Sequence, residues 1–178
     1  MIVKAVDDKT WPDLETLFEG RGGPKHCWCM AWRTRGDQSK LKGPGRKALL
    51  HARVEAGEPV GLLGYDGDEP VAWVSVAPRS TFRGLGGREG DDERIWSIVC
   101  FFIRRSDRGR GLFAQLVAAA EQEAKRHGAT AVEAYPVDPD SPSYRFMGFV
   151  GSFEEAGYVA VGRAGTRRHV VWKDLPGE

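Results

Sequence analysis

Two arginines and two glycines alternate in the middle of the chain, at Arg108, Gly109, Arg110 and Gly111. An apolar stretch precedes them, and a segment with helical spacing of its apolar residues follows. The first backbone N–H groups of a helix have no partner within it, and the helix dipole adds partial positive charge there. Glycine lets an anion approach the backbone, and arginine donates forked hydrogen bonds to phosphate. The pattern predicts a phosphate-binding turn; the alternative is an ordinary turn with solvated arginines.

The elements on either side of this turn have strong sequence signals. Residues 95–103 are apolar and rich in β-branched and aromatic side chains, which is typical of a strand buried on both faces. Residues 112–126 carry apolar side chains at helical spacing, and Gly128 supplies a helix-ending signal. Neither G-x-G-x-x-G nor G-x-x-x-x-G-K-[ST] occurs here, so the dinucleotide-fold and P-loop interpretations are set aside.

The remaining chain predicts one mixed α/β domain over residues 1–178. Patterns of alternating and continuous apolar residues predict the other elements. Strands are expected at 2–6, 60–65, 71–77, 132–137, 158–161 and 169–173, and helices at 10–18, 46–56 and 151–156. A glycine-rich, charged loop is expected at 80–93.

Composition excludes several classes of function. The formal net charge is +1, so no surface for nucleic acid or an anionic membrane is expected. No apolar stretch is long enough to cross a bilayer. Three cysteines are an odd number, which argues against a disulfide framework, and the N-terminus lacks the apolar core of a signal peptide. We therefore expect a cytoplasmic protein.

The turn and its strand have a further resemblance. The apolar triplet Phe101-Phe102-Ile103 and the run from Arg108 to Phe113 resemble the signature region of the GNAT superfamily of N-acetyltransferases, a strand followed by [RQ]-x-x-G-x-[GA] and a long helix. The run from Phe153 to Tyr158 resembles a second family element, Y-x-x-x-G-F. Two positions depart from the family pattern. At the position of Phe113 the family has Gly or Ala, and the phenylalanine side chain therefore has to turn away from a bound phosphate. At the position of Phe153 the family has tyrosine.

The resemblance implies a fold and a cofactor. The fold would be a mixed central sheet with splayed central strands flanked by helices. Acetyl-CoA would be the co-substrate, with its pantetheine arm along the triplet at 101–103. Its pyrophosphate would lie on the turn formed by Arg108, Gly109, Arg110, Gly111, Leu112 and Phe113. Acetyl would pass directly from the thioester to a primary amine.

Candidate acid–base residues are fewer than in relatives of this kind. Histone-type members carry a glutamate base at the strand position that Ser97 occupies here, and serine has no useful pKa of its own. The family's tyrosine acid is replaced by Phe153. Glu133 lies within the predicted apolar strand 132–137, next to the signature strand, so it faces either solvent or the cleft. We predict that Glu133, alone or through a water held by Ser97, accepts the proton.

An aromatic and cysteine-rich segment lies near the N-terminus. His26, Cys27 and Cys29 are metal-ligand types, but a fourth ligand is not evident, and no metal is predicted. A looser resemblance to a GNAT subgroup with Cys-x-Cys-Met-x-Trp-Arg favours Trp28 and Trp32 as walls of the acceptor site. Cys100 sits in an apolar strand, which favours a buried thiol over a nucleophile.

The sequence therefore predicts an acetyl-CoA-dependent N-acetyltransferase. The acceptor would be a small-molecule or peptide amine, and the protein would be a monomer or a homodimer. The alternative is a non-catalytic acyl-CoA-binding sensor or regulatory module, because the relatives' tyrosine and glutamate are both missing, at Phe153 and Ser97.

Overall fold

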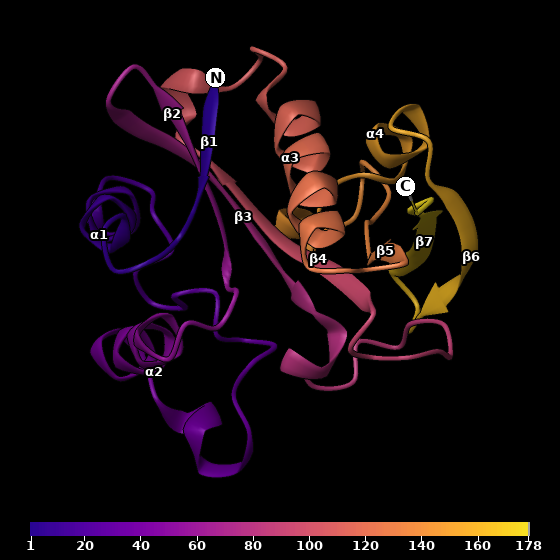
Figure 1. Ribbon diagram of the computed structural model, residues 1–178, viewed down its shortest axis with the longest axis horizontal. Helices are drawn as coiled ribbons and strands as arrows, with labels where there is room; N and C mark the ends of the chain where they lie inside the picture. The colour runs from indigo at the N-terminus through magenta and orange to yellow at the C-terminus, as the bar shows by residue number, and fades with distance from the viewer. Residues whose placement is uncertain (178) are drawn as a thin grey trace.

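A seven-stranded sheet runs through residues 1–177, which are the residues that the computed structural model describes (Figure 1). Its strands lie in the order β1-β2-β3-β4-β5-β7-β6. Their bounds are β1 Ile2–Ala5, β2 Gly61–Asp66, β3 Glu69–Pro78, β4 Ile95–Ile103, β5 Ala131–Ala134, β6 Val159–Ala164 and β7 Arg168–Asp174. This is the mixed α/β arrangement that the sequence predicts.

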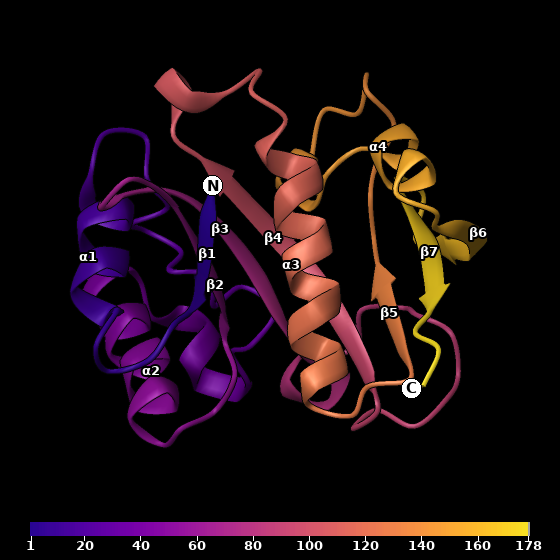
Figure 2. The ribbon, with the colours of Figure 1, turned by 45° about the horizontal axis from the view of Figure 1, so that its top comes forward.

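The two central strands, β4 and β5, are the one parallel pair among these neighbours. They pair only from Ile95↔Ala131 to Ile98↔Ala134, although β4 continues to Ile103. The expected strand 132–137 is therefore too long at its end, because the chain leaves the ladder after Ala134. Figure 2 shows β4 and β5 together at one end and diverging toward the other, as expected of splayed central strands.

Helices cover both faces of the sheet. Helix α3 (Leu112–Arg126) lies across one face, and α1 (Trp11–Glu19) and α2 (Gly43–Glu55) cover the N-terminal half of the other (Figure 2). Consecutive strand residues feed different cores, because side chains alternate between faces. Leu62 and Val74 join the cluster under α3, whereas Leu63 and Trp73 join the cluster under α1 and α2.

The signature strand and helix have the predicted bounds, and the shorter elements differ. Helix α2 begins at Gly43, three residues before the predicted start. Helix α4 is Val150–Glu155, one residue earlier than predicted. Four short 3₁₀ helices were not predicted, since a single turn has too few residues for a periodic signal. They are Gly36–Lys40, Arg79–Thr81, Arg105–Asp107 and Arg145–Met147.

Candidate active site

A groove of about 560 Å³ opens where β4 and β5 diverge. The triplet Phe101, Phe102 and Ile103 forms one side of it. Its full lining is Gly22, Phe101, Phe102, Ile103, Arg108, Phe113, Arg145, Phe146, Gly148, Phe149 and Ser152. The groove is therefore mostly apolar and aromatic, with two arginines and a single hydroxyl, and it could hold an extended apolar chain.

The glycine–arginine turn meets this groove at the start of α3. Gly109 and Gly111 have φ of 77° and 72°, in the left-handed region that favours glycine, and nothing lies within 4 Å of a Cβ built on either. Gly111 is the N-cap of α3 and supplies no side-chain hydrogen bond to the helix. The first N–H groups of α3 are thus free of a side-chain cap, which is the condition for binding an anion there.

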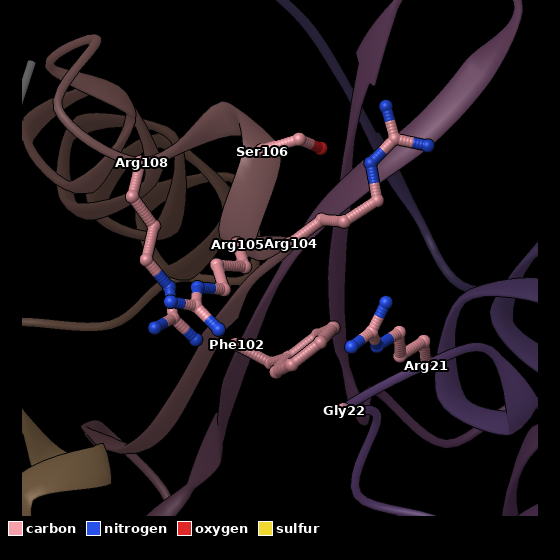
Figure 3. Close-up of a pocket in the computed structure, with 7 residues that line it drawn as sticks. All are labelled: Arg21, Gly22, Phe102, Arg104, Arg105, Ser106 and Arg108. Atoms are coloured by element: carbon pink, nitrogen blue, oxygen red, sulfur yellow. The ribbon is translucent and has the colours of Figure 1, made fainter.

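Arginines gather in a second hollow of about 620 Å³ that shares Gly22, Phe102 and Arg108 with the groove. Figure 3 shows the guanidinium groups of Arg105 and Arg108 on one side of Phe102 and that of Arg21 on the other. Arg108 Nε donates to the carbonyl of Ile103 at 3.0 Å. Its terminal nitrogens take part in no ion pair within residues 1–177, so they remain available to a phosphate.

Asp107 holds the turn from within. Its buried carboxylate accepts from Arg104 Nε at 2.7 Å, Arg110 Nη1 at 2.8 Å and Ser106 Oγ at 2.9 Å. The hydrogen bond from Arg104 is the largest cause of the lowered pKa of Asp107. Arg110 also pairs with Asp66 at 3.1 Å. The structure therefore places Arg110 among carboxylates, whereas Arg108 lines the groove.

An aromatic cluster explains how the turn accommodates Phe113. Its ring lies 4.3 Å from Phe101 and 5.4 Å from Phe153, between ring centroids. Phe113 thus packs against these two rings and also forms part of the groove wall, while Leu112 is buried in the core under α3. Phe153 is fully buried and packs edge-on against Tyr158. Phe153 cannot donate a proton, and Ser152 next to it is the hydroxyl that lines the groove.

The predicted acid–base residues meet on the face of the sheet opposite α3. The parallel register places Ser97 directly beside Glu133. Tyr135 joins them: its hydroxyl donates to Glu133 Oε1 at 2.7 Å and lies 2.7 Å from Ser97 Oγ. Burial raises the pKa of Tyr135 well above its ordinary value, and the charge of Glu133 raises it further. Because the phenol stays protonated, it donates to Glu133 and accepts from Ser97.

Glu133 is sealed by the loop between β3 and β4. Its carboxylate accepts from Arg79 Nη1 at 3.1 Å and from the backbone N–H of Arg88 at 2.7 Å. A Cβ built on Gly87 would overlap the Glu133 carboxylate, so only glycine lets the loop approach this closely. Ser97, Glu133 and Tyr135 are all fully buried. Glu133 thus points inward, and the loop covers the network.

The two N-terminal tryptophans lie in different surroundings. Trp28 is buried in the core under α1, with its ring 5.7 Å from Trp11 and 5.1 Å from Phe18. Trp32 is half-buried, with the guanidinium of Arg168 lying 4.7 Å from its ring. Of the two, Trp32 has the position that fits the wall of an acceptor site; its role there stays a prediction.

Residues that sequence reasoning missed at these sites include Arg21, Arg79, Arg88, Asp107 and Tyr135. Asp107 had a readable signal, since arginines stand three residues on either side of it. Arg21 and Arg79 reach the sites from segments far away in sequence.

Within residues 1–177, no three or more His, Cys, Asp or Glu side chains group as metal ligands. No helix in that part of the chain is long and apolar enough to span a membrane.

Three features together are typical of an acyltransferase-type fold. They are a splayed parallel pair of strands, an uncapped helix after a glycine–arginine turn, and an apolar groove. The chain belongs to the acetyltransferase (GNAT) family, whose sequence model matches residues 13–149. No curated protein matches the chain by sequence.

Solved structures share the fold at low identity. The GNAT domain of S. lividans PAT is 18% identical with a TM-score of 0.63, over 97% of this chain and 89% of that one. YncA from Salmonella typhimurium, solved with acetyl-CoA, is 17% identical with a TM-score of 0.56, over 98% and 92%. The aminoglycoside 6'-N-acetyltransferase from Enterococcus faecium is 15% identical with a TM-score of 0.58, over 100% and 99%.

Proposed function

We propose that this protein transfers the acetyl group of acetyl-CoA to a primary amine by direct attack of the amine on the thioester. The observation that carries the proposal is the groove between the end of β4 and residues 145–152, which reaches the uncapped start of α3. An extended, mostly apolar arm carrying phosphates at one end matches this combination. Coenzyme A has that chemistry, and membership of the acetyltransferase family supports the choice.

Each part of the cofactor would have a partner in the groove. Pantetheine would lie along Phe101, Phe102 and Ile103, where β4 no longer pairs with β5 and its backbone is free to hydrogen-bond the arm's amides. Pyrophosphate would lie at the first N–H groups of α3, with Arg108 donating to it. Gly109, Gly111 and Phe113 shape the turn, and Arg110 is held back by Asp107.

Proton removal from the ammonium would use the buried chain of hydroxyls. Ser97 would take the proton as it passes its own to Tyr135, and Tyr135 would pass its proton to Glu133. Glu133 is then the final acceptor, acting through Tyr135 and Ser97 rather than on the amine itself. Deprotonating an α-amine with pKa near 8 costs about 1 kcal/mol at pH 7, against roughly 4–5 for a lysine-like amine. Amines of low pKa are therefore the favoured acceptors.

The acceptor side would lie on the face opposite α3, where Trp32 contacts Arg168. We further propose a small-molecule or peptide amine as the partner rather than nucleic acid or a membrane, in keeping with the near-neutral charge. A cytoplasmic location and a single domain, as a monomer or a homodimer, complete the proposal. Three free thiols are consistent with a reducing compartment.

A non-catalytic acyl-CoA-binding module is the second candidate, and one observation favours it. The groove lining holds no carboxylate, histidine or tyrosine, and its only hydroxyl is that of Ser152. The Glu133 network lies beneath the surface. Such a site would bind the cofactor but give little acid–base help, which is typically worth 10²–10⁴-fold in rate.

The deciding experiment measures thiol release from acetyl-CoA over a panel of amines spanning pKa 7 to 10, with a thermal shift as the binding readout. The proposal expects a raised Tm with acetyl-CoA and turnover that favours the low-pKa amines.

Glu133→Gln should lower kcat by about 100-fold at pH 7. Its kcat should recover at high pH, and its cofactor affinity should be unchanged. A raised Tm without turnover on any amine favours the sensor. If the kcat of Glu133→Gln equals that of wild type at every pH, Glu133 does not accept the proton.

A further inference from the structure

Two cysteines from distant parts of the chain meet beside β4. Cys29 Sγ lies 3.3 Å from Cys100 Sγ, although 71 residues separate them. Cys100 is half-buried, and Cys29 is 7% exposed. The third cysteine, Cys27, is half-buried and receives a weak contact from Arg46 at 3.8 Å. The thiols in contact are therefore Cys29 and Cys100, which are far apart in sequence.

The surroundings of Cys29 favour a negative charge on its sulfur. The indole N–H of Trp73 donates to Cys29 Sγ at 3.0 Å. The guanidinium of Arg33 is fully buried, and its Nη1 and Nη2 donate to the carbonyls of Cys29 and Val60, both at 2.7 Å. The hydrogen bond from Cys100 and the charge of Arg33 lower the pKa of Cys29 against the effect of burial.

Arg33 gives an independent reason for an anion here. A buried guanidinium needs a negative partner, because leaving a charge uncompensated in the interior is strongly unfavourable. Its Nε is buried without a hydrogen-bond partner, and no ion pair within residues 1–177 includes Arg33. Burial lowers the pKa of Arg33 to about 10, and the Cys29 thiolate is the first of the charges that oppose this. The Phe82 ring, 4.7 Å from the guanidinium, offsets part of this cost, and a thiolate on Cys29, whose carbonyl Arg33 already contacts, would supply a negative charge nearby.

We propose that Cys29 and Cys100 form a peroxide-reactive thiol pair that closes to a reversible disulfide. The Cys29 thiolate attacks one peroxide oxygen, the O–O bond breaks, and a sulfenic acid forms as hydroxide leaves. That hydroxide takes up the proton that Cys29 released to solvent when it ionised, which gives water. The Cys100 sulfur then displaces the hydroxyl from Cys29, and the proton of Cys100 leaves with it as water. Two thiols are oxidised, and one hydroperoxide is reduced; with hydrogen peroxide two waters form.

Such a disulfide would connect two functional parts of the fold. Cys100 lies on β4 beyond its last pair with β5, next to a break in the β3 register between Ser75 and Val76. It directly precedes the triplet that lines the groove. Bond formation at about 2.05 Å would draw the sulfurs together and tie the N-terminal segment around Cys29 to this strand. The proposal does not depend on which acceptor the protein uses.

The test treats the full-length reduced protein with stoichiometric hydrogen peroxide and maps the products by mass spectrometry without reduction. Trypsin would release Cys27 and Cys29 together in residues 26–33 and Cys100 in residues 95–104. The expected product is a cross-link between these two peptides, with loss of two hydrogens and full reversal by dithiothreitol. Cys29→Ser and Cys100→Ser should each abolish it, and the matched variant Cys27→Ser should leave it intact.

Trp73→Phe keeps an aromatic ring but removes the indole N–H, so it should slow cross-linking by about twofold to tenfold, the worth of one hydrogen bond. Three results would overturn the proposal. One is a cross-link lost in Cys27→Ser. Another is a cross-link that persists in Cys29→Ser. The third is irreversible oxidation to sulfinic or sulfonic acid with no cross-link at any peroxide concentration.

Discussion

Two buried carboxylates, Asp107 and Glu133, each accept hydrogen bonds from arginine, and they organise two different regions. Asp107 binds Arg104 and Arg110, each three residues away in sequence. Glu133 binds Arg79 and the Arg88 amide, 54 and 45 residues away. The first carboxylate shapes an open turn at the start of α3, and the second closes a loop over a sealed network. The partners of Asp107 are close in sequence, so its turn can form locally and stays accessible. The partners of Glu133 are distant in sequence, so its network can form only when the sheet and the β3–β4 loop are in place.

The largest effect is expected from disturbing the sealed carboxylate. Gly87→Ala puts a Cβ where the Glu133 carboxylate lies, so the loop has to move and the Arg88 hydrogen bond is lost. The free energy of unfolding should fall by about 2–4 kcal/mol, because the buried carboxylate loses one of its donors and the loop is displaced. Urea denaturation measures it.

Gly84→Ala is the matched control, since nothing lies within 4 Å of a Cβ at that position in the same loop. It should stay within about 0.5 kcal/mol of wild type. Equal losses in the two variants would show that the loop tolerates neither change and that the contact with Glu133 is not special.

A smaller effect should separate the two arginines of the open turn. Arg108→Ala removes a guanidinium that lines the groove, and affinity for acetyl-CoA should fall by roughly tenfold to a hundredfold, since a charge-assisted contact is worth about 1.5–3 kcal/mol. Arg110→Ala should cost less affinity, because Asp66 and Asp107 already hold that side chain. Isothermal titration calorimetry compares them, and the reverse order would place the phosphates on the Arg110 side.

The smallest effect is expected in how the stability of the turn around Asp107 depends on pH. Because the pKa of Asp107 is lowered in the folded state, its contribution to stability is fully present above about pH 4 and is lost as the pH falls through the lowered value. Asp107→Asn should be less stable than wild type at pH 6, and the difference should narrow toward pH 3. Urea midpoints of both proteins across this range measure it. A difference that stays constant with pH would mean that the carboxylate charge is not what stabilises the turn.

The difference between the two carboxylates also explains what the sequence could predict. Strand β4, the turn at 108–111 and helix α3 are contiguous, and their local patterns predict their bounds correctly. The pairing of Ser97 with Glu133 followed from expecting parallel neighbours. The partners Arg79, Arg88 and Tyr135 could not be found, because loop closure and side-chain direction bring them together. Likewise, neither Cys29 nor Cys100 carries any local sign of the other.

The hydrogen bond from Arg88 to Glu133 has a consequence for solvent access. Arg88 is exposed and lies in a glycine-rich loop, where backbone amides ordinarily exchange their protons with water within moments. Its own N–H, however, is tied to a carboxylate that no solvent reaches. That single amide should therefore exchange far more slowly than those of Gly84 and Gly86 in the same loop. The rate of deuterium uptake at the Arg88 amide would then measure how often the loop opens and exposes Ser97, Tyr135 and Glu133 to solvent.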